Sequence, residues 1–153
     1  MAHEPLPEDL KADGAAVLAL ASKLGMAPRE AAWLYEHDFG AWRYYLVTPV
    51  VRAVGPMEAY GALAETLPRT SLHPRFNVID VHLVDPSEEM ADLLASCRSA
   101  AAGADPLVAR HNRNGTVFDA YVYPVEPPGD TDAKSLKKTF RRSLRDFMRV
   151  AAA

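Results

Sequence analysis

The chain has 153 residues, of which 49% are hydrophobic and 24% are charged, and its net charge is −3 at pH 7. This length and balance fit one folded domain and exclude the low-hydrophobicity, high-charge composition of disordered chains. The single cysteine, Cys97, excludes an internal disulfide and a zinc site built from several cysteines.

Residues 1–26 are predicted to contain an N-terminal helix. Pro7, Glu8 and Asp9 are typical of a first helical turn, and Gly25 suits the C-terminal cap. The acidic start lacks the basic flank and the apolar run of a secretory signal, and no later stretch approaches the ~20 apolar residues of a membrane span. We therefore expect a cytoplasmic protein with no membrane span.

Residues 27–124 are predicted to form a sheet with two crossover helices. Two aromatic, β-favouring runs within residues 31–48 flank a four-residue connection that contains a glycine, which favours a hairpin. Gly55 and Pro56 then begin a helix with one apolar side, made of Met57, Tyr60, Leu63, Ala64 and Leu67. The alternating run NVIDVHLV, residues 77–84, is typical of a third strand.

The next helix has the clearest predicted boundary in the chain. Asp85 occupies the expected N-cap position, Pro86 the first helical position, and Glu88 completes an Asp version of the capping box. Apolar residues follow at helical spacing: Met90, Leu93, Leu94 and Cys97. This spacing favours a buried structural thiol at Cys97 over a nucleophile.

Residues 107–124 are predicted to form a second hairpin around Asn114 and Gly115, because both positions of such a turn need positive φ. The element order is then α-β-β-α-β-α-β-β-α. This order describes one α+β domain over residues 1–153 with a mixed five-stranded sheet, in which the two crossover helices favour parallel neighbouring strands.

The predicted sheet is unusually rich in aromatic residues. If all helices pack on one face, the other face carries a large aromatic surface, and a protein seldom leaves such a surface without a partner. We therefore expect this face to serve self-association, with a homodimer as the commonest arrangement. The residues concerned are Trp33, Tyr35, Trp42, Tyr44, Tyr121 and Tyr123.

The run WRYYLVTPVV followed by GPMEAY, with NGTVFDAYVY about sixty residues later, resembles a group of small uncharacterised bacterial α+β proteins. The resemblance covers residues 31–67 and 114–123. It implies a hairpin, a helix that begins at Gly-Pro and a closing Asn-Gly hairpin. It implies no activity, cofactor or catalytic residue.

Candidate catalytic chemistry rests on three residues. Asp80 and His82 share one face of the predicted third strand, and His111 could join them if the strands are ordered favourably. Asp85 is already used in capping, and two remaining groups do not specify a metal, so we predict no metal and no cofactor. The chain also lacks a Gly-x-Ser-x-Gly nucleophile motif and a phosphate-binding loop.

Charge is concentrated at the C-terminal end, where residues 125–132 form a predicted hinge before a basic helix over residues 133–150. Residues 133–149 hold seven cations and one acid, a net charge of +6, which leaves −9 for the rest of the chain. One side of this helix is apolar and is called the apolar stripe; it consists of Leu136, Phe140, Leu144 and Phe147. The predicted partner-binding cations lie along another side: Lys134, Lys138, Arg141, Arg145 and Arg149.

Three interpretations of the basic helix follow. It could bind the phosphate backbone of nucleic acid, attach to an acidic protein or membrane surface, or dock its apolar stripe on its own domain with solvated cations. The last is compatible with either of the others, because a docked helix still exposes its basic side.

The sequence favours a binding protein over an enzyme. The leading hypothesis is a bacterial accessory protein of the cytoplasm whose basic C-terminal helix contacts an acidic partner, with nucleic acid first among the candidates. The alternatives are a small hydrolase built from Asp80, His82 and His111, with or without a metal, and a purely protein-binding regulatory module.

Overall fold

The computed structural model confirms the α+β fold class and the mixed five-stranded sheet. It describes residues 5–38, 40–72, 76–101, 105–113, 115–126, 129 and 131–152. The helices are α1 (Glu8–Lys23), α2 (Val50–Val54), α3 (Pro56–Thr66), α4 (Glu89–Ala100) and α5 (Ala133–Ala152). The strands are β1 (Glu30–Glu36), β2 (Ala41–Val47), β3 (Val81–Val84), β4 (Leu107–Arg113) and β5 (Thr116–Val122).

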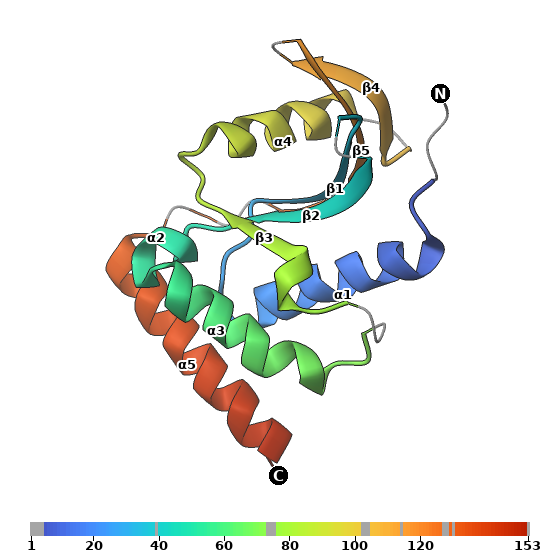
Figure 1. The fold of residues 1–153 in the computed structure, drawn as a ribbon. Coiled ribbons are helices and arrows are strands. Elements are labelled where there is room, and N and C mark those ends of the chain that lie inside the picture. The colour runs from blue at the N-terminus through green and yellow to red at the C-terminus, as the bar shows by residue number, and fades with distance from the viewer. Residues whose placement is uncertain are drawn as a thin grey trace.

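The strands are ordered β3-β2-β1-β5-β4 across the sheet. Both predicted hairpins are present: β1 pairs antiparallel with β2, and β4 with β5. The crossover through α2 and α3 joins parallel neighbours, β2 and β3, as expected. The same expectation for α4 is wrong, because β3 and β4 form opposite edges and α4 carries the chain across the whole sheet (Figure 1).

Helices cover both faces of the sheet (Figure 1). One face packs against α1, α3 and α5 in the larger core cluster, where Leu24, Leu63 and Phe140 are fully buried. The other face packs against α4 in a smaller cluster that includes Cys97. Cys97 is a buried thiol, as predicted from its spacing.

The oligomerisation face was predicted on the premise that all helices pack on one side and leave the aromatic side of the sheet uncovered. This premise is wrong. Trp33, Tyr44 and Tyr123 lie in the core beneath α1, with exposed fractions of 3%, 0% and 6%. Tyr35, Trp42 and Tyr121 are half-buried on the same face. Because three of the six rings already have a covering within one chain, the aromatic composition no longer calls for a second copy.

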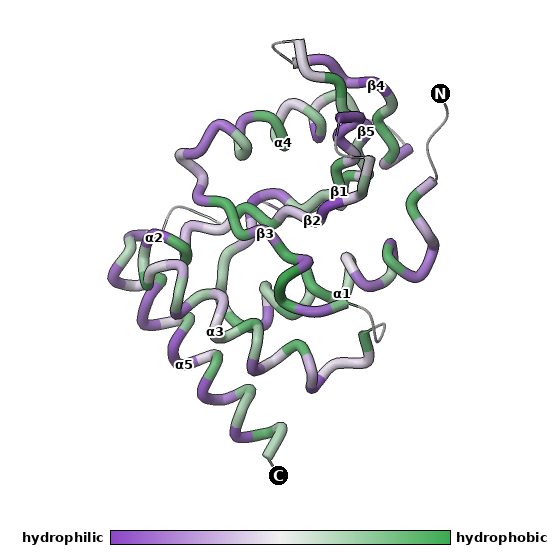
Figure 2. The backbone as a smooth tube through the Cα atoms, in the orientation of Figure 1, coloured by the Kyte–Doolittle hydropathy of each residue, from purple (hydrophilic) through white to green (hydrophobic). Residues whose placement is uncertain are grey.

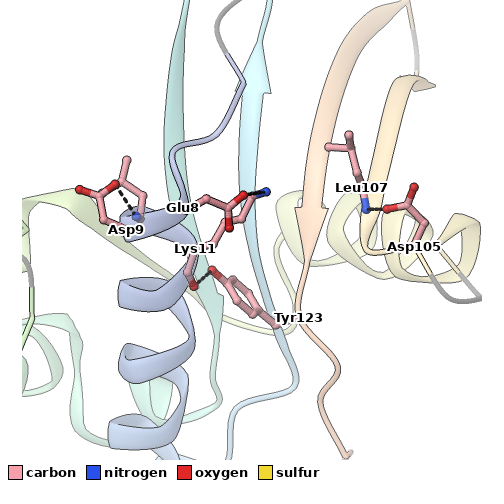
Figure 3. Close-up of polar contacts among 7 residues, drawn as sticks. Glu8, Asp9, Lys11, Asp105, Leu107 and Tyr123 are labelled. Carbon is pink, nitrogen blue, oxygen red and sulfur yellow. Dashed lines mark hydrogen bonds and ion pairs between the residues drawn. The ribbon is translucent and has the colours of Figure 1, made fainter.

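Two side-chain hydrogen bonds hold α1 on this aromatic core, and a third joins two side chains of the core itself. Tyr44 donates to the carbonyl of Gly14 (2.9 Å) and Tyr123 to the carbonyl of Lys11 (2.7 Å; Figure 3), while Trp33 Nε1 donates to the Tyr123 hydroxyl (3.1 Å). Burial raises the pKa of both phenols, so they remain donors at physiological pH. The helix can approach this closely because residue 14 has no side chain.

The predicted third strand is only half strand. Its first part forms a turn of 3-10 helix, Val78–Asp80, and β3 begins at Val81. The Asn77 side chain accepts from Ile79 N (2.9 Å), and the Asp80 carboxylate accepts from Asn77 N (3.0 Å). These local bonds satisfy backbone groups that a strand would have paired, so they compete with the ladder.

The second predicted helix, α3, is preceded by a short helix that the sequence did not indicate, α2. The buried side of α3 matches the expected one in part: Leu63 and Leu67 are buried as predicted. Met57 is 88% exposed and Ala64 is also exposed, and Ala59 and Ala62 are buried in their place. Small residues on the buried side let α3 pack closely against the core, and they contribute little to an apolar periodicity.

The helix predicted to begin at Pro86 begins three residues later, at Glu89. The capping contacts are nevertheless present in the preceding turn. Asp85 accepts hydrogen bonds from the N–H (3.0 Å) and hydroxyl of Ser87, and Glu88 accepts from Asp85 N (2.6 Å). Partial burial opposes the charge of Asp85, but the Ser87 hydrogen bonds outweigh it and hold its pKa below the ordinary value.

We expect Asp85→Ala to lower the free energy of unfolding by about 1 kcal/mol, because the acceptor of the Ser87 hydrogen bonds is lost, and Asp85→Ser, which keeps an acceptor but not the charge, to lower it less. Because the folded pKa is depressed, the charge contributes stability above the unfolded pKa and loses it as pH falls through the folded pKa. Urea denaturation at neutral and acidic pH measures both effects. A cost of Asp85→Ala that stays constant down to acid pH would contradict this role.

The turn between β4 and β5 joins Arg113 to Thr116 and contains Gly115 at a φ of +83°. Asn114 lies outside the described residues. Replacing Gly115 with valine is expected to cost about 1 kcal/mol or more, because a β-branched residue resists positive φ. Gly115→Asn is the matched control and should cost less, since asparagine tolerates this region. An unchanged melting temperature in the valine variant would remove the turn assignment.

None of the helices in the described ranges combines the length and apolar character required to cross a bilayer.

Candidate functional site

The basic helix α5 begins beside Asp132, at the end of the predicted hinge. Ser135 N donates to the Asp132 carboxylate (2.7 Å), and this hydrogen bond is the main reason why the pKa of Asp132 lies below its ordinary value. Asp132 is thus the N-cap of α5. A capped first turn fixes where the helix starts.

The apolar stripe of α5 is docked on the domain. Leu136 and Phe140 are buried, with exposed fractions of 4% and 0%, and the half-buried Leu144 and Phe147 pack against the same core cluster. Lys23 at the end of α1 places its Nζ 5.3 Å from the centroid of the Phe147 ring. The predicted docking of the stripe is confirmed, and it fixes which side of the helix remains outside.

An ion pair sets the orientation of α5 relative to α3. Arg141 donates from Nε (3.0 Å) and from its terminal nitrogen (2.9 Å) to the two carboxylate oxygens of Glu58. These hydrogen bonds hold the pKa of Glu58 below its ordinary value and raise that of Arg141. Arg141 is therefore already engaged within the chain.

All five predicted partner-binding cations are exposed. They recur every three or four residues between Lys134 and Arg149, so they share one side of the helix, a span of about 22 Å at the helical rise per residue. Figure 2 shows hydrophilic residues recurring along α5 in this way. Arg149 lies 3.4 Å from Asp146.

Three of the five, Lys134, Lys138 and Arg145, have no ion pair with any residue that the structure describes, and neither has the adjacent Arg142, which is also exposed. We call these four the cationic face. An uncompensated row of this kind creates a positive potential that attracts anions along its length.

The docking of the apolar stripe separates a membrane surface from the other anionic partners considered for the helix, nucleic acid and an acidic protein surface. A helix that lies in a membrane interface inserts its apolar side among the lipids. In α5 that side is occupied by the protein core, because Phe140 is fully buried. The exposed side offers charge and little apolar surface, which suits a hydrated polyanion.

The candidate catalytic residues do not converge. His82 lies on β3 and His111 on β4, the two edges of the sheet with three strands between them. At about 4.8 Å between neighbouring strands, these edges are roughly 19 Å apart. Asp80 is occupied as the acid of the Asn77 capping box. The three residues predicted for a hydrolase therefore do not form one shared site.

Asp80 and His82 do share an open pocket of about 460 Å³ with Trp42 and Arg43. Burial and the Arg43 guanidinium lower the pKa of His82, with a partial offset from Asp80. Arg43 would also repel a metal cation. Among the described residues, no three His, Cys, Asp or Glu side chains are grouped to hold a metal ion.

The structure contains a Ser–His contact that no sequence motif indicated. Ser96 Oγ on α4 lies 2.8 Å from His111 Nε2, and 3.1 Å from the carbonyl of Leu93. The single hydroxyl hydrogen serves only one of these acceptors, and the bond to Leu93 is the usual one for serine within a helix. The surrounding N–H groups of α4 are used within the helix and are not available as oxyanion donors. The pair is best explained as a clamp between α4 and β4.

Comparisons with protein-family models, with curated proteins and with solved structures found no match to this chain.

Proposed function

We propose that this protein is a binding module of the cytoplasm whose cationic face contacts the phosphate backbone of nucleic acid. The observation that carries the proposal is the orientation of α5: the apolar stripe is buried, and four cations remain without an ion pair among the described residues. Phosphates accept hydrogen bonds from lysine and arginine and release counterions when they are neutralised.

The proposal implies binding that depends little on base sequence. A docked helix with long, flexible cationic side chains neutralises charge but places no rigid group at a base edge. Affinity should then depend steeply on salt, because each neutralised phosphate releases condensed ions. An acidic protein surface, including the −9 remainder of a second copy of this chain, is the competing partner.

The test reverses two charges of the cationic face. Lys138→Glu with Arg145→Glu should weaken binding to a short fluorescent duplex by more than the loss of two contacts, because it adds repulsion. Arg141 is left unchanged, since its replacement would also break the ion pair with Glu58. Fluorescence anisotropy measures affinity, and the melting temperature should stay within a few degrees because both residues are exposed.

The matched control is Arg29→Glu with Arg69→Glu, which makes the same charge change at exposed positions outside α5. It should leave most of the affinity intact. Equal loss in both double variants would show that net charge and not the cationic face drives binding. If sedimentation showed salt-sensitive dimers and the protein did not bind nucleic acid, the partner of the cationic face would be an acidic surface of a second copy.

A further inference from the structure

A β-bulge interrupts the pairing of β4 with β5 on the face that α1 covers. Val108 pairs with Ala120 and His111 with Phe118, so two residues of β4 oppose Asp119 alone. One of them, Arg110, has a φ of +54°, and its N–H donates to Asp119 Oδ1 (2.7 Å). Bulges of this kind redirect side chains and recur beside binding sites.

The bulge buries a carboxylate. The Asp119 side chain is 6% exposed, and its Oδ1 also lies 3.6 Å from His37 Nε2. Burying a carboxylate is costly unless neighbouring groups compensate for the lost water. A binding site is one reason why a chain keeps an acid in such a position, because the desolvated charge interacts strongly with a bound group of opposite sign.

Asp119 lines a pocket of about 510 Å³ between the bulge and the start of α1. Trp42, Tyr121 and Leu6 contribute apolar surface, and Lys11 and Asp105 contribute charge. Figure 3 shows Lys11 on α1 on one side, with Asp105 and Leu107 across from it. A volume of this order suits a small organic ligand.

The charges of the lining favour a cation. Two carboxylates, Asp105 and Asp119, face one ammonium, and that ammonium is held by Glu8 at 2.8 Å. Lys11 Nζ lies 5.1 Å from the centroid of the Tyr121 ring, a cation–π contact within the chain. Asp105 is held in place by a hydrogen bond from Leu107 N (2.9 Å).

We propose that this pocket binds a small organic cation, a primary ammonium on a flat apolar body. The ammonium interacts with the negative charge of Asp119, and the apolar body packs on the surface of Trp42 and Leu6. This site is on a different part of the molecule from the cationic face and does not depend on the function proposed for α5.

The test uses three probes of similar shape on the full chain: phenethylammonium, its neutral analogue 2-phenylethanol and the anion 3-phenylpropionate. Isothermal calorimetry and saturation-transfer NMR should show saturable binding of the ammonium and at least about tenfold weaker binding of the other two, the usual scale for one charged hydrogen bond. Absence of saturable ammonium binding up to about 20 mM, or equal binding of all three probes, would overturn the proposal.

Asp119→Asn removes the charge and keeps an oxygen that can accept from Arg110 N. It should weaken phenethylammonium binding about tenfold or more, while the exposed Glu65→Gln changes it less than about twofold. Unchanged affinity in a folded Asp119→Asn protein would overturn the assignment of Asp119. If that variant does not fold, the comparison of the three probes on the natural chain still tests whether the pocket prefers an ammonium.

Discussion

Phe140→Ala is expected to lower the free energy of unfolding by about 3–5 kcal/mol, among the largest effects of any single change in this chain. The Phe140 ring is 0% exposed and lies at the centre of the apolar stripe. Its removal leaves a cavity between α5 and the core cluster, and the other elements that line it are too well packed to collapse fully.

Urea denaturation followed by circular dichroism measures this loss. Phe147→Ala is the matched control, because the same side chain is removed from the same helix at a half-buried position, and its cost should be clearly smaller. If Phe140→Ala cost less than about 1 kcal/mol, the helix would not be docked as described, and the orientation of its cations would no longer be fixed.

The second large effect is expected at Gly14, where alanine should destabilise the fold although alanine favours helices. A Cβ atom at this position would lie 2.2 Å from Tyr123 Oη and 2.6 Å from Trp33 Nε1. Both atoms belong to the hydrogen-bonded contacts that hold α1 on the sheet. Overpacking of this kind costs about 1–3 kcal/mol, which exceeds the gain of about 1 kcal/mol in helix propensity.

Gly61 provides the opposite control, because it also lies within a helix and nothing is within 4 Å of its Cβ position. Gly61→Ala should therefore stabilise the protein by up to about 1 kcal/mol. Thermal denaturation of the two variants should give melting temperatures on opposite sides of the natural protein. Stabilisation by both changes would contradict the close approach of α1 to the aromatic core.

The sequence was most informative where structure depends on neighbouring residues. The first helix, the two hairpins and the docked stripe of α5 follow from capping residues, turn glycines and periodicity within about twenty residues. The failures had a local cause too. Asn77 and Asp80 form a side-chain capping box, and a 3-10 turn takes the place of the first half of the predicted third strand. The composition of this segment gave no reason to expect a capped turn in place of strand pairing.

Features that depend on distant segments could not be predicted. Strand order separates His82 from His111 and joins His111 to Ser96, and no local pattern records either fact. The burial of Tyr123 depends on α1, because its hydroxyl donates to the carbonyl of Lys11, which lies 112 positions away in the sequence. The bulge at Asp119 arises because two residues of β4 oppose one residue of β5, and only the pairing of the two strands shows this.

The central claim is that α5 docks through its apolar stripe and presents the cationic face to a polyanion. A salt titration of binding to a short DNA duplex of arbitrary sequence tests it most directly. With four cations engaged, log Kobs should fall against log salt with a slope of about −3 to −4, since each neutralised phosphate contributes about −0.9. A slope near zero, or no binding at about 20 mM salt, would contradict the claim.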